Sequence, residues 1–335
     1  MKRIDIIERL KRQQVIIDAH THVGISTSNY IASASYPYAM SFEDLVVRMD
    51  ALGIDNSIIF PFESSYYPLF GDDEAISSPA RSSFPYEKEN ENLLREIFDV
   101  FPEYAERAIP FAMFDPSQKT AEQAIALETL YAKYPICGLK TLTTYIKAFV
   151  KDFQRPGNEL KAFAIKHQLP ITFHCSWIKE DVWANVFDIL DIAEATPELN
   201  FALAHSARFS KIALERAAAL PNCFVDISAF KIHCDLAVEQ SEIVACGSDA
   251  FATDYSNPEG ALQQLAEAYP ETILWGSDTP YHYFAQKYID PNGKVIDCRL
   301  FSRYDREMKI LQSLPAELRQ KIAYDNIMKF LQTTV

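Results

Sequence analysis

Short apolar runs of five or six residues recur along the chain and are separated by longer segments with helical periodicity. Many of the runs are rich in β-branched and aromatic residues, which favour buried strands. The runs cover residues 15–19, 57–61, 108–113, 136–141, 170–174, 200–205, 223–228 and 272–277. Helical periodicity is clearest over residues 42–52, 120–133, 159–167 and 258–269. Eight strands that alternate with helices predict a parallel sheet, because parallel strands need crossover connections.

Eight βα units predict a closed (β/α)8 TIM barrel that occupies residues 1–335 as a single domain. Helix exits marked by proline precede several strands, as in "KHQLPITFH" and "AYPETILWGSD". A doubly wound open sheet is the alternative fold. It is disfavoured because neither GxGxxG nor GxxxxGK[ST] follows any predicted strand.

Two segments stand outside this repeating pattern. Residues 63–92 follow the second strand, are irregular in pattern and contain five aromatic residues, so we expect an inserted lid. Residues 1–14 alternate charged residues with Ile and Leu, which predicts a short amphipathic helix and neither a signal peptide nor a membrane anchor.

Charge and cysteine content limit the function classes. Lys and Arg total 32 against 46 Asp and Glu, a formal net charge of −14, so nucleic acid is not an expected partner. No apolar run is long enough to cross a bilayer. The six cysteines form no CxxC pair, which favours free, mostly buried thiols over disulfides or a zinc–thiolate site. A soluble, cytoplasmic protein is expected.

Residues that suit metal coordination stand at the ends of four predicted strands. They are Asp18, His20, His22, His174, His205 and Asp278. Taken singly, a histidine at a strand end is more often a hydrogen-bonded structural residue, and an aspartate before proline can cap a helix. Taken together they predict a shared site, because the carboxyl ends of all barrel strands meet at one rim.

The pair His20 and His22 gives this site its geometry. Residues two apart on a strand point to the same side and lie about 7 Å apart along the chain. Their imidazoles can therefore turn toward one ion at the usual nitrogen–metal distance of about 2.0–2.1 Å. Inward-facing side chains from the later strands converge on the same axis, which predicts a metal centre.

Four motifs, "DAHTHVG", "ITFHCS", "ALAHSAR" and "ILWGSDTP", together resemble the amidohydrolase superfamily, specifically its amidohydrolase-related (ACMSD-like) branch. The segments "LVVRMDALGIDNSIIFP" and "NENLLREIFDVFPEYAERAIPFAMFDP" resemble the second and third βα units of that branch, and "LPAELRQKIAYDNIMKFL" its C-terminal helix. The resemblance covers about residues 15–332. Many members carry His-x-Gly where this chain has "HCSW" and "HSAR", so Ser176, Ala207 and Arg208 are expected to narrow the pocket or touch substrate.

The resemblance implies roles for five of the strand-end residues. His20, His22 and His174 would be metal ligands, and Asp278 both a ligand and the proton-transfer group. His205 would bind a second ion or donate a hydrogen bond to substrate. One or two divalent ions are implied, with Zn²⁺ expected and Mn²⁺, Fe²⁺ or Ni²⁺ able to use the same ligands.

Other polar residues near the predicted rim leave alternatives open. Lys140 in "CGLKTLTT" could be carboxylated and bridge two ions, could bind a substrate carboxylate as a cation, or could be structural. Asp18 is implied to orient an imidazole, and Asp226 is expected to be a structural hydrogen-bond partner. The expected substrate-contacting residues are Arg208, Lys231, His282 and Tyr66.

The expected function is a metal-dependent hydrolase in which an activated water attacks an amide, ester or lactone carbonyl of a small, anionic substrate. A metal-dependent decarboxylase of an aromatic or unsaturated acid would use the same ligands and is the first alternative. A non-catalytic ligand-binding barrel is the second. The chain is expected to act on a small molecule, as a monomer or a homodimer.

Overall fold

Eight parallel strands form one sheet in a computed structural model that describes residues 2–13, 15–25, 39–67, 82–281, 283–289 and 295–332 (for 283–289 and 296–298 only the backbone). Their order is β1, β4, β5, β6, β7, β8, β9, β10, which is also their order along the chain. The strands are β1 Ile17–His22, β4 Asn56–Phe60, β5 Ala108–Met113, β6 Gly138–Thr141, β7 Ile171–Phe173, β8 Phe201–Leu203, β9 Cys223–Asp226 and β10 Ile273–Leu274.

Hydrogen bonds between the last strand and the first close this sheet into a barrel. The amide of Ala19 donates to the carbonyl of Trp275 (2.9 Å), and that of Asp278 to the carbonyl of His20 (2.8 Å). Thr21 and Thr279 form a parallel bridge at the same seam. The predicted (β/α)8 barrel is confirmed, and the doubly wound alternative is wrong because an open sheet has no such seam.

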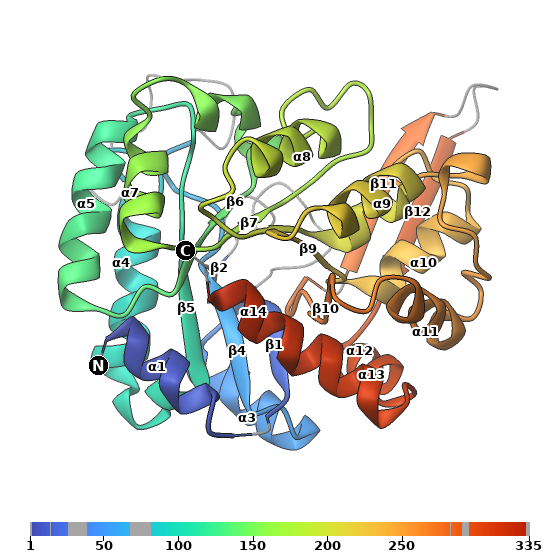
Figure 1. Cartoon of the computed structure of the whole chain (residues 1–335), viewed down its shortest axis with the longest axis horizontal. Coiled ribbons are helices and arrows are strands. Elements are labelled where there is room, and N and C mark those ends of the chain that lie inside the picture. Colours follow the sequence, from blue (N-terminus) through green and yellow to red (C-terminus); the bar gives the residue numbers. More distant parts are fainter. Residues whose placement is uncertain are drawn as a thin grey trace.

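Helices surround the strands (Figure 1). They are α1 Arg3–Leu10, α3 Phe42–Leu52, α4 Glu87–Arg95, α5 Thr120–Lys133, α6 Thr143–Ile146, α7 Glu159–His167, α8 Val186–Glu194, α9 Lys211–Ala219, α10 Phe230–Val238, α11 Pro258–Ala268, α12 Tyr304–Gln312, α13 Ala316–Gln320 and α14 Asn326–Leu331. The predicted helices at 42–52, 120–133 and 159–167 match α3, α5 and α7 at both ends. Sequence signals fix such ends: Ser41 caps the amide of Asp44 at the start of α3, and Gly53 ends it at a φ of 71°.

The chain ends cover one end of the barrel and leave the other end for the site. Asn200, just before β8, donates to the backbone carbonyls of Lys329 (2.9 Å) and Phe330 (3.0 Å) in α14. The guanidinium of Arg3 in α1 donates to the carbonyl of Leu331 (2.6 Å). These contacts lie at the amino ends of the strands, so the carboxyl ends, where His20 and the later histidines follow, face the opposite side.

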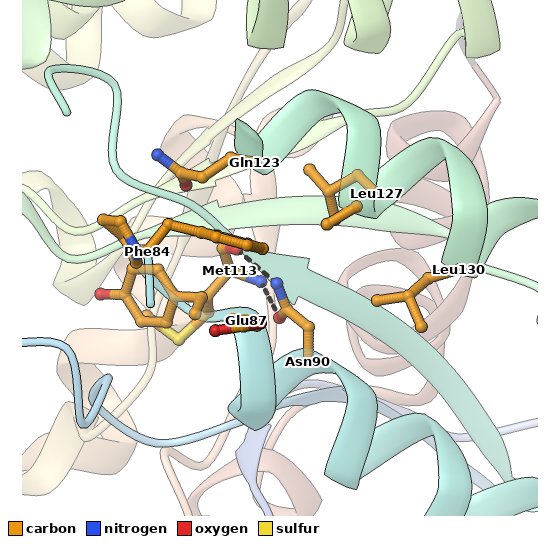
Figure 2. Close-up of a pocket in the computed structure, with 10 residues that line it drawn as sticks. Phe84, Glu87, Asn90, Met113, Gln123, Leu127 and Leu130 are labelled. Carbon is orange, nitrogen blue, oxygen red and sulfur yellow. Dashed lines mark hydrogen bonds between the residues drawn. The ribbon is translucent and has the colours of Figure 1, made fainter. Parts of the chain in front are cut away.

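The segment predicted as a lid contains a helix at its end. Residues 68–81 lie outside the described residues, so the lid over 63–92 stays a prediction, while α4 begins at Glu87. Figure 2 shows how Asn90 of α4 is fixed: its side chain accepts from the amide of Met113 (2.7 Å) and donates to the carbonyl of Met113 (2.8 Å) at the end of β5. The cavity beside this pair has a volume of about 10 Å³, barely room for one water, so it is no substrate site.

An antiparallel hairpin follows the barrel strands and was not predicted. It pairs β11 (Tyr283–Ile289) with β12 (Val295–Phe301). A shorter ladder pairs β2 (Gly24–Ile25) with β3 (Ala39–Met40) directly after β1. Within the described residues, no helix is long and apolar enough to span a membrane, and the cysteines at 137, 175, 223, 234 and 246 are free thiols.

Replacing Glu307 with glutamine should remove a pH-dependent loss of stability. Burial raises the pKa of this carboxyl group from its usual 4.5 to about 7, although it accepts hydrogen bonds from Ser302 (2.5 Å) and the amide of Lys231 (3.3 Å). A raised carboxyl pKa means that the folded state holds the proton more tightly, so stability falls as the pH rises from 4.5 through 7. In urea unfolding, the free energy of unfolding of the variant should therefore rise relative to that of the wild type between about pH 5 and 8, by up to roughly 3 kcal/mol. Glu317→Gln, at an exposed position, should show no such gain, and a parallel pH response of E307Q and the wild type would contradict the prediction.

Candidate metal centre

Three side chains from the two strands at the barrel seam meet at one point. His20 and His22 belong to β1, and Asp278 follows β10. The Nε2 atoms of the two histidines are 3.3 Å apart. The Asp278 Oδ1 atom lies 3.2 Å from the His20 Nε2 and 3.7 Å from the His22 Nε2. All three residues are buried.

Hydrogen bonds at the other ring nitrogen orient both imidazoles. The His20 Nδ1 contacts the Asp226 carboxylate at the end of β9, and the His22 Nδ1 lies 3.0 Å from the carbonyl oxygen of Pro61. Both partners are acceptors, so each Nδ1 carries the proton and each Nε2 directs a lone pair at the shared point. Burial also lowers the pKa of both histidines well below 6.5, which keeps them neutral.

The donor atoms fit a divalent cation. Two imidazole nitrogens and a carboxyl oxygen converge here, and burial raises the pKa of Asp278 well above its usual 3.8. A divalent cation among these atoms would favour the ionised carboxylate, because an opposite charge at short distance stabilises the charged form. Their separations of 3.2, 3.3 and 3.7 Å bracket the spacing of about 3.3 Å expected between ligand atoms that each lie 2.0–2.1 Å from a tetrahedral Zn²⁺. The group His20, His22 and Asp278 is therefore a suitable metal site.

Lys140 of β6 lies beside this group. Its Nζ is 3.0 Å from the His20 Nε2 and 4.7 Å from the centre of the Phe60 ring. Burial lowers its pKa to about 8, although the carboxylates of Asp226 and Asp278 act in the opposite direction. The ammonium thus contacts a nitrogen that faces the shared point.

Asp18 of β1 has a different role from the one expected, whereas Asp226 at the end of β9 has the expected one. Asp18 was expected to orient an imidazole, but its Oδ1 accepts the backbone amides of His20 (3.0 Å) and Ser277 (2.9 Å), so it ties the barrel seam instead. The carboxylate that contacts the His20 ring is Asp226. Burial raises the pKa of Asp226 to about 7, while the nearby Lys140 lowers it. Asp226 is thus a structural hydrogen-bond partner, as expected, and its partner is the imidazole of His20.

A second polar group lies next to the first and is centred on Arg208. This guanidinium donates to the carbonyl oxygen of Cys175 (2.7 Å), to the His233 Nε2 (2.7 Å) and to the His174 Nε2 (3.0 Å). The other nitrogen of His174, Nδ1, lies 3.0 Å from the His205 Nε2. The structure therefore places His174 and His205 with Arg208.

His205 joins the two groups. Its ring centre is 5.6 Å from that of His20 and 4.7 Å from that of His174. Its Nδ1 lies 3.1 Å from the Ser228 Oγ and 3.9 Å from the Asp278 Oδ2. The two groups are thus halves of one continuous site at the carboxyl ends of the strands.

The backbone that carries His205 and Arg208 makes a left-handed turn. The five residues from His205 to Phe209 have φ values of 60°, 57°, 47°, 55° and 59°, and none of them is glycine. Left-handed helical backbone costs about 1–2 kcal/mol for each such residue. Conformations of this kind persist only where surrounding contacts fix them, and they are concentrated at functional sites.

Two residues that were expected to contact substrate lie apart from this site, and a third is outside the described residues. The Lys231 Nζ pairs with both Asp235 oxygens (2.5 and 2.6 Å) on the same helix, α10. The Tyr66 hydroxyl lies 3.3 Å from the Gln118 Oε1 beyond β5. His282 is outside the described residues. Of the three expected substrate contacts that the structure describes, Arg208 alone lies with the histidines.

Sequence reasoning missed the role of His233. This residue is buried on α10, donates from Nδ1 to the carbonyl of Ala229 (2.9 Å) and accepts from Arg208. It carries no strand-end signal, and its position on the inner side of a helix is visible only in the fold. The signal available was a histidine a few residues after the predicted seventh strand.

The family model for amidohydrolases, described as Amidohydrolase, matches residues 77–333. This chain belongs to the amidohydrolase family. Family membership identifies it as an enzyme and confirms the resemblance at that level. No curated protein sequence matches the chain.

Solved structures share the fold of this amidohydrolase at low identity. An amidohydrolase from Burkholderia multivorans with bound HEPES is 15% identical, with a TM-score of 0.59, and the match covers 95% of this chain and 99% of that one. A probable 2-pyrone-4,6-dicarboxylic acid hydrolase from Acinetobacter baumannii, with citric acid bound, is 13% identical, with a TM-score of 0.52 and coverage of 94% and 98%. A 4-oxalomesaconate hydratase from Rhodopseudomonas palustris is 14% identical, with a TM-score of 0.50 and coverage of 94% and 95%.

Proposed function

We propose that this amidohydrolase is a metal-dependent hydrolase of the amidohydrolase-related (ACMSD-like) branch, acting on an amide, ester or lactone of a small molecule. The observation that carries the proposal is the convergence of the His20 Nε2, the His22 Nε2 and the Asp278 Oδ1, with both Nδ1 atoms hydrogen-bonded to acceptors. Such outer hydrogen bonds are what fixes the tautomer and direction of a ligating histidine.

His20, His22 and Asp278 would hold the ion. Two imidazole nitrogens and a carboxylate oxygen suit Zn²⁺, and Mn²⁺, Fe²⁺ or Ni²⁺ can use the same atoms. When bound, the ion supplies activation of water at neutral pH and polarisation of the acyl carbonyl. Lys140 can take part in coordination only if it is carboxylated, because an ammonium group has no lone pair. As an ammonium group, it would neutralise part of the charge of Asp226 and Asp278.

The protein residues then control one proton. Asp278 accepts it from the attacking water and returns it to the leaving group, since this carboxylate lies between the two histidines of β1 and His205. His205 stands beside this carboxylate, with its Nδ1 3.1 Å from the Ser228 Oγ and 3.9 Å from the Asp278 Oδ2. Burial of all these groups strengthens each electrostatic contact and limits competition from bulk water.

Replacing Asp278 with asparagine tests this assignment together with metal removal. The amide cannot take a proton from water, so kcat should fall by about 100-fold or more, while most of the bound metal is retained through His20 and His22. Turnover of a panel of lactones, esters and amides would be followed after dialysis against a chelator and again after Zn²⁺ or Mn²⁺ is returned.

The proposal fails if chelation leaves hydrolysis unchanged or if D278N keeps a near-normal rate. The same assay run on aromatic and unsaturated carboxylic acids, with detection of released CO2, covers the alternative reaction. Metal-dependent CO2 release without hydrolysis of any panel member would establish a decarboxylase. Stoichiometric metal with no turnover of either panel would favour a ligand-binding barrel.

A further inference from the structure

Glu63 is a buried carboxylate with one oxygen that lacks a hydrogen-bond partner. Its side chain is only 7% exposed. The Oε1 atom accepts a hydrogen bond from the Tyr281 hydroxyl (2.8 Å). The Oε2 atom is buried and has no hydrogen-bond partner among the residues that the structure describes. Because burial of an unpartnered polar atom costs free energy, such an atom calls for a partner that the chain itself does not supply.

Glu63 lies at the carboxyl end of β4, beside the metal site. The carbonyl of Pro61, two residues earlier, lies 3.0 Å from the His22 Nδ1. Tyr281, three residues after Asp278, places its ring centre 4.9 Å from that of His22, with the two rings nearly perpendicular at 89°. The segment that carries Glu63 and the residue that binds its Oε1 therefore both contact a proposed metal ligand.

Aromatic packing fixes the partner of Glu63. The Phe62 ring centre is 5.4 Å from that of His22 and 5.3 Å from that of Tyr281. Burial raises the pKa of Tyr281 well above 10, and the charge of Glu63 raises it further, so the hydroxyl keeps its proton and donates it to Glu63. One oxygen of Glu63 is thus held in place, which leaves the direction of the other one defined.

The neighbouring carboxylate, Glu89 of α4, shows the contrasting case of a structural role. Its Oε2 accepts from the Ser64 hydroxyl (3.1 Å), and its Oε1 accepts from the amide of Ser65 (2.7 Å). The Ser64 hydroxyl oxygen in turn accepts the amide of Tyr86 (2.8 Å). Both oxygens of Glu89 therefore hold the loop that follows Glu63, whereas Glu63 uses only one of its own.

The chemistry of the site favours a hydroxyl group as the missing partner. A carboxylate oxygen can only accept, so the partner must be a donor. Glu63 is not in the group of side chains that could hold the metal. An ammonium group would be repelled by a bound divalent ion and by the cations of Lys140 and Arg208, both of which are buried nearby in the same site. A neutral hydroxyl avoids this repulsion and still forms a strong, charge-assisted hydrogen bond.

We propose that Glu63 is a specificity-determining residue whose Oε2 accepts a hydrogen bond from a hydroxyl group of the substrate, while the reacting carbonyl of the substrate lies at the metal site. This inference rests on the proposed function and deepens it, because it names a hydroxylated lactone, ester or amide as the substrate class. Tyr281 is the positioning residue for Glu63.

The first arm of the test compares kcat/KM for γ-butyrolactone, its α-hydroxy and β-hydroxy derivatives and its α-amino derivative, at about pH 6, where the amine is protonated. The wild type should prefer at least one hydroxylated lactone over the parent by about 10–100-fold, the value of a hydrogen bond to a charged group. E63M should reduce that preference to less than about 3-fold, because no acceptor remains. E63Q should keep part of it, because the amide oxygen can still accept.

Two variants control this comparison. Y281F removes the hydroxyl that holds Glu63 but leaves the carboxylate, so it should keep the preference for the hydroxylated lactone even if both rates fall. E307Q changes another buried carboxyl group, one that is bound by Ser302 and the amide of Lys231, and it should leave the preference unchanged.

The second arm needs no substrate and separates a functional from a structural carboxylate. In the Y281F background Glu63 has lost its Oε1 partner, so adding E63M removes a buried carboxylate with no hydrogen bond at either oxygen. The Tm of the double variant should therefore exceed that of Y281F by about 1–3 °C. A lower Tm in the double variant would show that Glu63 stabilises the fold through another partner and would overturn the proposal.

Three results of the first arm would also overturn it. They are an unchanged preference in E63M, a wild type that does not distinguish the hydroxylated lactones from the parent, and a wild type that prefers the amino lactone and loses that preference in E63Q. If Y281F loses the preference as completely as E63M and the double variant loses no more, Glu63 acts only through Tyr281, and a direct contact with substrate is again excluded.

Failure of the proposed function is recognised separately. A wild type that hydrolyses no lactone, ester or amide after Zn²⁺ or Mn²⁺ is added overturns the hydrolase and the substrate class with it. The Tm comparison in the Y281F background still decides whether Glu63 has a structural role. Metal-dependent hydrolysis without any dependence of the preference on Glu63 overturns only the specificity-determining role.

Discussion

His20→Ala is expected to abolish both metal binding and turnover, with a fall in kcat/KM of at least about 1000-fold. His20 has more functional contacts than any other histidine described: its Nε2 faces His22, Asp278 and Lys140, and its Nδ1 contacts Asp226. Removing the ring takes away one metal donor and leaves the buried Asp226 carboxylate without its partner. Metal content after gel filtration and rates for the best panel substrate measure the two effects.

A matched control for this variant is His167→Ala. His167 lies on α7, where its Nε2 contacts the Glu128 carboxylate at 3.1 Å and its ring packs on Tyr131, away from the barrel rim. This variant should keep full metal content and near-normal rates. Retention of stoichiometric metal by H20A would contradict the assignment of the centre to the β1 histidines.

Gly276→Ala is expected to have the second largest effect, through the packing around His20. A Cβ atom at this position would lie 2.8 Å from the Asp226 Oδ1, 2.8 Å from the His20 Cβ and 3.1 Å from the His20 amide nitrogen. Real contacts of this kind are not tolerated, and the backbone of β1 cannot retreat without opening the seam. Overpacking of this kind typically costs about 1–3 kcal/mol. Displacing His20 from Asp226 should also weaken Zn²⁺ binding by about 10–100-fold.

Gly53→Ala is the control that separates a loss of stability from a loss of Zn²⁺ affinity. Gly53 has a φ of 71° and nothing within 4 Å of an added Cβ, and it lies between α3 and β4, beyond the amino ends of the strands. Its alanine variant should lose about 1–2 kcal/mol of unfolding free energy through backbone strain alone, with Zn²⁺ affinity unchanged. If G276A destabilised the fold equally but left the affinity at the wild-type value, close packing at His20 would not be what positions the metal ligands.

The barrel could be predicted from sequence because each of its strands is an apolar run followed by a polar group. Seven of the eight predicted runs contain the observed strand or most of it, and the run at 15–19 contains the first half of β1. The closing hydrogen bonds at Ala19 and Asp278 are the expected consequence of eight βα units. The β11–β12 hairpin was missed because its residues mix charged and aromatic side chains. The Asn-Gly pair at 292–293 was the available turn signal.

The sequence predicted which residues form the metal site better than it predicted the contacts between them. His20, His22 and Asp278 could be placed together because strand ends converge on one rim. The pairing of Asp226 with His20 required the β9–β10–β1 neighbourhood, which sequence spacing alone does not fix. The hydrogen bond from Arg208 to His174 depends on a left-handed turn of five residues without glycine, and no sequence rule predicts such a turn.

The seam between β1 and β10 also determines when during folding the site can exist. Asp18 and Ser277, which are hydrogen-bonded there, lie 259 positions apart in sequence, so this contact closes nearly the whole chain. Loop closure over such a length is entropically unfavourable and slow, and we expect the seam to form after the sequential strand pairs. An ion bound by His20, His22 and Asp278 would span this last-formed junction as a cross-link between the two ends of the polypeptide. It would therefore stabilise the native state by mass action and slow its opening at the one strand pair that is not sequential.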